Sequence, residues 1–197
     1  APIPISPEID SDGINFQLDT GADISGTVYQ SNGSDPITGV PIRVHVYQGD
    51  PCGSHQYVRH ADTDPADGTY TVSGIPLGTY YLQTWNINQS NYMNEWWASG
   101  GSTYDCSGAG QLTLDAGGET GIDFQLDLGG SISGIITHQD TGDPIANANI
   151  QVYNDNWQHI HGIQGNSDGT YILGGIPTGT YYVEANGQVW VDPNWEW

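Results

Sequence analysis

A long internal repeat constrains the fold of this chain more than any other feature. The segment Gly13–Val28, GINFQLDTGADISGTV, returns as Gly121–Ile136, GIDFQLDLGGSISGII, so that residue 13 becomes residue 121 at an offset of 108. A second block, Asp67–Leu82, returns as Asp168–Val183 at the shorter offset of 101 (residue 67 becomes residue 168). Such self-similarity indicates copies of one structural unit. The difference in offset predicts an insertion in the first copy, which we place at the segment QGDPCGSHQ.

Hydrophobic residues alternate along each copy with a period of two. This period puts them on one face of a β-strand. The alternating sets are Val40, Ile42, Val44 and Val46 in the first copy and Ala146, Ala148, Ile150 and Val152 in the second. Further strands are expected at Ser25–Tyr29, Gln56–His60, Thr69–Ser73, Tyr80–Trp85, Gln111–Leu114 and Ile122–Leu126. With 28 glycines and 11 prolines for turns, the sequence predicts an all-β chain of tandem antiparallel β-sandwiches, about seven strands per repeat.

The repeat boundaries predict three parts. Residues 1–20 are the closing strands of a preceding repeat, or a segment donated to a neighbouring subunit. Residues 21–127 form the first sandwich, and residues 128–197 form a second sandwich that lacks its closing strands. The chain opens with APIPISPEID and shows no signal peptide or membrane span, so we expect a processed product or a window of something longer.

The charge is strongly negative. The chain has 23 Asp and Glu residues against two basic residues, Arg43 and Arg59, for a formal charge of −21. Nucleic acids and anionic membrane surfaces are therefore excluded as natural partners, because like charges repel. Bound cations would relieve the repulsion within the fold, whereas the alternative is that the acids keep an extracellular protein soluble.

Cysteine usage indicates an oxidising compartment. Cys52 and Cys106 are the only two cysteines and neither belongs to a C-x-x-C motif. We expect a single disulfide that staples the inserted loop, in a secreted or cell-surface protein.

The order of these motifs carries a family resemblance. The strand ISGTV, the turn DPITGVPI, the strand VHVY and the block DTDPADGTYTVSGIPLGTYYL follow one another, and most of them recur in the second copy. This order resembles the carboxypeptidase regulatory-like or prealbumin-like domain, a relative of the collagen-adhesin B-type repeats of bacterial surface proteins. The resemblance implies Greek-key sandwiches of the prealbumin-like or immunoglobulin-like kind and a stalk or fibre module without catalysis. Adhesin repeats often carry a lysine-to-asparagine crosslink, and this chain has no lysine.

The aspartates are candidates for another stiffening device. Asp62, Asp64 and Asp67 form a D-x-D-x-x-D-G turn whose oxygen ligands suit calcium. The alternative is a turn whose aspartates cap their own backbone. Strand order places this turn near Asp127, so a calcium site at the joint between repeats is expected to use Asp62, Asp64, Asp67 and Asp127. Asp19 is the counterpart of Asp127 one repeat earlier, and Asp168 belongs to a weaker site in the second copy.

Two aromatic clusters recur once per repeat. The segments NYMNEWW and DPNWEW align so that Glu95 matches Glu196. Trp96 and Trp97 follow Glu95 and end the first segment. Trp197 ends the second. These residues either pack at the sandwich end and between repeats or stack on sugar rings. His159 and His161 share a strand face that could seat zinc, although a chance surface pair explains them too.

No catalytic motif is present, so we do not expect an enzyme. The main hypothesis is a structural module of an extracellular bacterial fibre, stalk or adhesin, joined head to tail to copies of itself or to adjacent repeats, with calcium stiffening the joints. The alternatives are a carbohydrate-binding module that uses the tryptophans and an accessory domain of a secreted peptidase. The ends favour assembly, since Ala1–Asp19 supplies the closing strands that the second repeat lacks.

Overall fold

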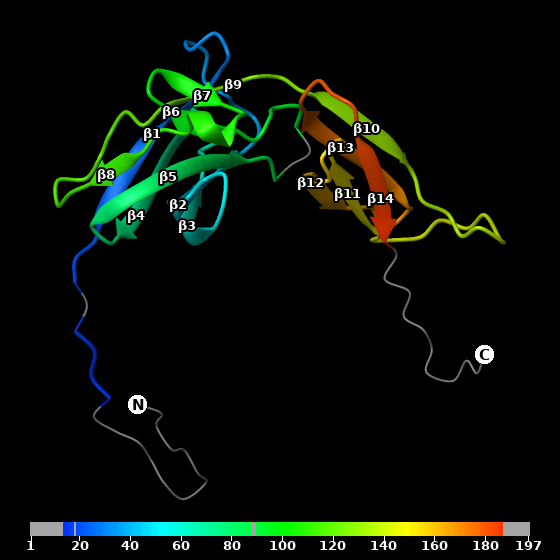
Figure 1. Cartoon of the computed structure of the whole chain (residues 1–197), viewed down its shortest axis with the longest axis horizontal. Coiled ribbons are helices and arrows are strands. Elements are labelled where there is room, and N and C mark those ends of the chain that lie inside the picture. The colour runs from blue at the N-terminus through cyan, green and yellow to red at the C-terminus, as the bar shows by residue number, and fades with distance from the viewer. Residues whose placement is uncertain (1–13, 18, 88–89, 187–197) are drawn as a thin grey trace, which may run out of the picture.

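The structure is a computed structural model and describes residues 14–17, 19–87 and 90–186. Within these ranges the chain is all-β apart from the short 3-10 helix η1, Cys106–Gly108, which confirms the predicted fold class. Figure 1 shows two groups of strands, β1 to β9 and β10 to β14, joined by the segment between β9 and β10. No helix among the described residues is long and apolar enough to cross a membrane.

The first repeat packs two sheets face to face. One sheet has the order β4-β1-β9 and the other has the order β3-β2-β5-β6-β7, with β8 also paired to β5. The strand bounds are β1 Ala22–Gln30, β2 Arg43–Gly49, β3 His55–Asp62, β4 Thr69–Ile75, β5 Gly78–Trp85, β6 Trp96–Ala98, β7 Gly101–Thr103, β8 Leu112–Leu114 and β9 Phe124–Leu126. Alternation along the strands produces the core, because Ile42, Val44 and Val46 all point inward and are buried.

The last strand of the first repeat runs parallel to the first. Val28, Tyr29 and Gln30 of β1 lie opposite Phe124, Gln125 and Leu126 of β9. The other strand pairs of this repeat are antiparallel, as predicted. The aliphatic and aromatic side chains of β8 and β9 are buried and complete the core. The first repeat is therefore closed by residues at its C-terminal end.

The second repeat uses the same plan with fewer strands. Its strands are β10 Gly130–Ile135, β11 Asn149–Tyr153, β12 His159–Gln164, β13 Thr170–Ile176 and β14 Tyr182–Asn186. Among the described residues its sheets are β10-β13 and β12-β11-β14. The counterparts of β8 and β9 are missing from this set, and the fully buried cluster shrinks to Ile150, Val152, Leu173 and Ile176.

Three details differ from the sequence prediction. The described strands number nine in the first repeat and five in the second, instead of about seven in each. The hairpin β6–β7 was not predicted, since strands of three residues carry almost no periodic signal. Ala146 is exposed and precedes β11, so the alternating face of that strand begins at Ala148.

Candidate assembly surfaces and the joint between repeats

The closing strand of the first repeat is held by a specific set of contacts. The backbone N–H of Ser25 donates to the carbonyl oxygen of Glu119 over 2.9 Å, and the N–H of Ile122 donates to the carbonyl of Ser25 over 3.1 Å. The N–H of Thr27 donates to Oδ1 of Asp123 over 2.8 Å. The segment before and including β9 is thus paired along most of the length of β1.

Two side-chain features make this pairing close. A Cβ atom on Gly26 would lie 2.1 Å from the carbonyl oxygen of Ile122, so only glycine permits the approach. The hydroxyl of buried Tyr70 donates to that same carbonyl over 2.6 Å. The ring of Tyr70 also contacts the ring of Phe124, with centroids 6.2 Å apart. Gly26 and Tyr70 together form a seat for the carbonyl of residue 122.

The second repeat repeats this seat without an occupant among the described residues. Gly134 on β10 corresponds to Gly26, and Tyr171 on β13 corresponds to Tyr70. In the described part of the chain, β10 has a single strand neighbour, β13. Ile132 and Ile136 are only partly buried, whereas their counterparts Ile24 and Val28 are fully buried.

The segment before β1 has the sequence of the closing strand but not its environment. Ile14 and Phe16 are 46% and 80% exposed. Their counterparts Ile122 and Phe124 are 5% and 0% exposed. Figure 1 shows the blue segment before β1 leading away from the first repeat. The chain therefore carries an exposed copy of a strand that is buried elsewhere in the same molecule.

The two repeats meet through backbone contacts. The N–H of Gly129 donates to the carbonyl of Asn91 over 2.7 Å, and Tyr92 and Leu128 form an antiparallel bridge. Gly175, in the second repeat, approaches Tyr92 so closely that a Cβ would lie 2.1 Å from its carbonyl oxygen. The close approach of the two repeats at this joint therefore depends on a glycine at position 175.

Aromatic and acidic side chains surround this joint. The ring of His161 meets the ring of Trp85 edge to face, with centroids 5.7 Å apart. His161 is buried, and burial, with a smaller contribution from His159, lowers its pKa to about 4. An open cleft of about 480 Å³ lies between the repeats, lined by Trp85, Tyr104 and Asp105 on one side and His159 and Ile160 on the other.

Glu95 is the most deeply buried acid among the described residues, at 2% exposure. Its Oε1 accepts a hydrogen bond from the backbone N–H of Asp127 over 3.2 Å. Burial raises the pKa of Glu95 to about 7, the N–H of Asp127 opposes that shift, and the charge of Asp127 adds to it. The acid thus links the segment before β6 to the residue that follows β9.

The aspartates of the D-x-D-x-x-D-G turn do not gather around a common point. Asp62 forms a two-point ion pair with Arg43, from Nε to Oδ1 over 2.6 Å and from Nη2 to Oδ2 over 2.9 Å, which lowers the pKa of Asp62. Asp64 Oδ1 accepts from the N–H of Ala66 over 2.8 Å. Asp62 and Asp64 therefore have local partners.

Asp67 and Asp168 act alike in the two repeats. Oδ1 of Asp67 accepts from the N–H and the hydroxyl of Thr69 over 3.0 and 2.7 Å, and Oδ1 of Asp168 does the same with Thr170 over 3.0 and 2.6 Å. These bonds lower the pKa of both acids. The recurring D-G-T sequence is thus accounted for by turn formation.

The remaining predicted metal ligands are also dispersed. Asp19 is exposed before β1, and the backbone of Asp127 is used at the joint. Among the described residues, the single group of three side chains close enough to share an ion is Cys52, Asp105 and Cys106, whose cysteines are bonded to each other. The predicted set of Asp62, Asp64, Asp67 and Asp127 is therefore not assembled in this structure.

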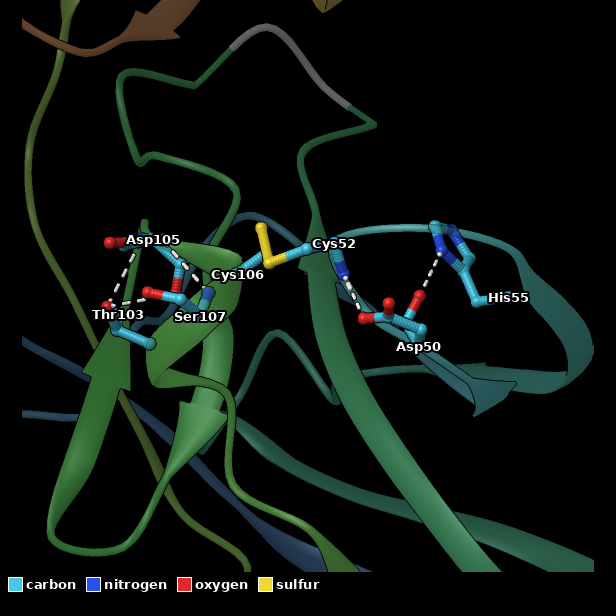
Figure 2. The surroundings of a disulfide bond; sticks show 7 residues. All are labelled: Asp50, Cys52, His55, Thr103, Asp105, Cys106 and Ser107. Atoms are coloured by element: carbon cyan, nitrogen blue, oxygen red, sulfur yellow. Dashed lines mark hydrogen bonds between the residues drawn. A yellow bond between two sulfur atoms is a disulfide. The ribbon is translucent and has the colours of Figure 1, made fainter.

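The predicted disulfide between Cys52 and Cys106 is confirmed (Figure 2). Cys52 lies in the turn after β2, where its N–H donates to Oδ1 of Asp50 over 3.0 Å. Cys106 begins η1, which Asp105 caps by accepting from the N–H of Ser107 over 2.9 Å. The bond joins the inserted β2–β3 loop to the segment after the β6–β7 hairpin.

The two tryptophans that follow Glu95 pack against other side chains and are not exposed on the surface. Trp96 is 4% exposed and contacts the rings of Tyr47 and His55, each with centroids 5.7 Å apart. Trp97 is partly buried against the first core. Glu196 and Trp197 lie outside the described residues. Trp157 is 66% exposed, and its ring stacks on that of Tyr182 with centroids 4.5 Å apart. Trp157 was not singled out from the sequence, because a side chain exposed in a turn leaves no periodic pattern.

Comparison with known proteins confirms the resemblance for the second repeat. Residues 131–189 match the family model of the carboxypeptidase regulatory-like domain. Among curated proteins, a search finds no match to the chain.

Solved structures that are similar to this chain include a Bacillus anthracis protein and two pilins. The Bacillus anthracis TIE protein is 16% identical with a TM-score of 0.38, over 84% of this chain and 28% of its own. A streptococcal ancillary pilin is 16% identical with a TM-score of 0.37, over 83% of this chain and 53% of its own. The shaft pilin SpaA of Lactobacillus rhamnosus GG is 11% identical with a TM-score of 0.35, over 85% of this chain and 88% of its own. The chain thus spans only part of the first two.

Proposed function

We propose that this chain is a structural repeat module of an extracellular bacterial fibre, stalk or adhesin, and that its copies join head to tail. The observation that carries the proposal is the mismatch between the two ends. The second repeat has an open β10 edge among the described residues, and the segment with Ile14 and Phe16 exposes the side chains that close the first repeat. An exposed edge and an exposed apolar strand of matching sequence favour pairing.

The geometry favours pairing between chains over pairing within one chain. Leu126 lies opposite Gln30, so the joint is at the C-terminal end of β1, and Ala22 begins β1 at the other end. The nine residues of β1 span roughly 30 Å at about 3.3 Å per residue. The link from Gln17 to Ala22 reaches about 18 Å at most. Residues 14–17 therefore cannot reach β10 of their own chain, and an open, non-closing array results.

Charge and redox chemistry support an extracellular location. A disulfide persists in an oxidising environment, and a net charge of −21 keeps separate fibres apart.

Calcium at the joints is a separate proposal. It rests on the charge of −21 and on the number of exposed aspartates. Against it, Asp62, Asp64 and Asp67 each have a local hydrogen-bond partner. A bound ion would have to compete with these contacts, so its test is a comparison of melting curves, given in the Discussion.

A carbohydrate-binding role is the second candidate, and a different residue now favours it. Trp96 is buried, but the exposed Trp157 stacked on Tyr182 offers a flat apolar surface. A glycan array would test this role. Sugar binding should disappear in Trp157→Ala, whereas Trp96→Ala changes a buried side chain that cannot contact the sugar. An accessory role in a secreted peptidase rests on the family name alone.

The assembly proposal is tested with the purified full-length chain. Light scattering and electron microscopy at rising concentration should show linear species longer than one chain. A denaturing gel of those species should give a band near 21.2 kDa, because the link between chains is non-covalent. A very large species in denaturant would mean that the repeats belong to one long chain. A compact monomer at every concentration would refute assembly by this chain.

A further inference from the structure

The structure assigns the partner of the open β10 edge at residue level, and this inference rests on the proposed head-to-tail function. We infer that residues 14–17 of a second copy bind β10 as a parallel strand, in the register in which β9 binds β1. The corresponding strands are related by the offset of 108, so Phe16 faces Ile136 and Gln17 faces Thr137, as Phe124 faces Val28 and Gln125 faces Tyr29.

The backbone groups needed for this pairing are present on β10. In the first repeat the counterparts of residues 14 and 15, Ile122 and Asp123, pair with the carbonyl of Ser25 and the N–H of Thr27. The corresponding residues of β10 are Ser133 and Ile135, on the edge away from β13. Unpaired backbone groups along a sheet edge are a template for an added strand.

The side chain of residue 15 fits one of these groups. Asp123 accepts the N–H of Thr27 through Oδ1 in the first repeat. Asn15 takes the place of Asp123 in the incoming strand, and its amide oxygen can accept the N–H of Ile135 in the same way. The change from acid to amide also removes one negative charge from each junction between chains that are already strongly acidic.

Gly134 and Tyr171 provide the seat for the carbonyl of Ile14. The Cβ that Gly134 lacks would lie 3.0 Å from the hydroxyl oxygen and 3.1 Å from Cε1 of Tyr171, so the edge of the Tyr171 ring covers Gly134 in this chain and must turn aside when the carbonyl arrives. In the closed repeat the corresponding hydroxyl of Tyr70 donates to the carbonyl of Ile122 over 2.6 Å. We therefore expect Tyr171 to donate to the carbonyl of Ile14 of the second copy.

The apolar surface matches as well. Ile132 and Ile136 are partly buried and pack against the small second core. Phe124 is the residue that covers the equivalent surface of the first repeat, where it is fully buried. Phe16 is a phenylalanine at the same position of the incoming strand and is 80% exposed in this chain. Its transfer to the neighbouring core supplies the hydrophobic free energy of the junction.

Two full-length variants separate donor from acceptor. Phe16→Asp damages the donor at an exposed position, so it leaves the fold intact. Gly134→Ala blocks the acceptor, because the new methyl occupies the path of the carbonyl of Ile14. Within the chain the nearest atoms to that methyl are the hydroxyl oxygen, Cε1 and Cζ of Tyr171 at 3.0 to 3.2 Å, so the Tyr171 side chain has to shift by a few tenths of an ångström. Gly130→Ala is the matched control on β10, since its Cβ would lie 3.7 Å from the carbonyl of Ile176 in ordinary contact.

Each blocked variant alone should remain at the mass of one chain by light scattering, whereas Gly130→Ala should assemble like the wild type. Mixed in equal amounts, the two blocked variants should form a species of twice 21.2 kDa and nothing longer, because one live donor meets one live acceptor. Assembly of Gly134→Ala into long species would overturn the register while leaving head-to-tail assembly standing. A monomeric wild type would instead overturn the proposed function itself.

Tyr171→Phe tests the seat without risk to the fold. In the Phe16→Asp background, which does not polymerise, this change should leave the melting temperature unaltered. In the mixing experiment with Gly134→Ala it should weaken the two-chain species about tenfold, the effect of losing one buried hydrogen bond. Tyr181→Phe is the control, because the Tyr181 hydroxyl donates to the carbonyl of Pro177 over 2.7 Å inside its own repeat. Equal affinity with and without the Tyr171 hydroxyl would overturn its assigned role.

Discussion

At the scale of single residues, Glu95 makes the fold sensitive to pH. Its pKa is raised from 4.5 to about 7. Between these two pH values Glu95 is therefore protonated in the native state and ionised in the unfolded chain. The stability contributed by neutral Glu95 is therefore present below pH 4.5 and is lost as the pH rises toward 7. Across that window the loss amounts to roughly 3 kcal/mol at most, from about 1.4 kcal/mol per pKa unit.

Glu95→Gln should remove this dependence. The amide oxygen can still accept the N–H of Asp127, so the variant should gain stability over the wild type as the pH rises from 5 to 8. Urea unfolding at several pH values measures the difference. His45 and His161, with pKa values lowered to about 4, act in the opposite direction and cancel in the comparison. Asp140→Asn, at an exposed acid, is the control, and a constant difference for Glu95→Gln would contradict the assignment.

At the scale of elements, the disulfide fixes the inserted loop between β2 and β3. Its ends are 54 residues apart. A loop of that length gives about 4 kcal/mol of stabilisation by the chain-entropy model. Replacing Cys52 and Cys106 by serine should lower the free energy of unfolding by about that amount. The unreduced wild type should also weigh two hydrogens less than the reduced form. Two free thiols in the purified protein would contradict the bond.

The strands show what periodicity can and cannot predict. Period-two alternation located the long strands, because a half-buried strand needs it, and the repeat located their counterparts. The parallel pairing of β1 with β9 was not predictable, since alternation reports which face is buried and not which strand is adjacent. Trp96 illustrates the same limit, because its burial depends on Tyr47 and His55 from distant strands.

The aspartate turn shows the limit for the candidate site. A D-x-D-x-x-D-G sequence offers the same oxygens to an ion and to its own backbone. The choice depends on details outside the motif. Arg43, one of two basic residues in the chain, forms an ion pair with Asp62, and Thr69 donates a hydrogen bond to Asp67. The ligand set predicted from spacing alone therefore competes with partners that only the folded structure reveals.

At the scale of the whole molecule, calcium is tested by comparing ions. If a calcium site exists, millimolar CaCl₂ should raise the melting temperature more than MgCl₂ at the same ionic strength, because a site built from carboxylates at irregular geometry suits calcium. Chelator should reverse the gain. Equal effects of the two salts would mean general screening of the charge of −21 and no specific site.

The same charge should govern the length of the fibre. Each added chain brings 23 acidic residues close to those of its neighbour, while the strand exchange at the junction buries apolar side chains such as Phe16. The repulsion is screened by salt, with a Debye length of about 30 Å at 0.01 M and about 8 Å at 0.15 M, and the apolar burial is not weakened by it. Mean fibre length should therefore increase with NaCl concentration at fixed protein concentration. A junction held mainly by ion pairs would respond in the opposite way. The two basic residues per chain leave little scope for such pairs, because Arg43 is already bound to Asp62 and Arg59 donates to the carbonyl of Ser73. Fibres that shorten as salt is added, measured by electron microscopy or light scattering, would show that strand exchange is not what joins the chains.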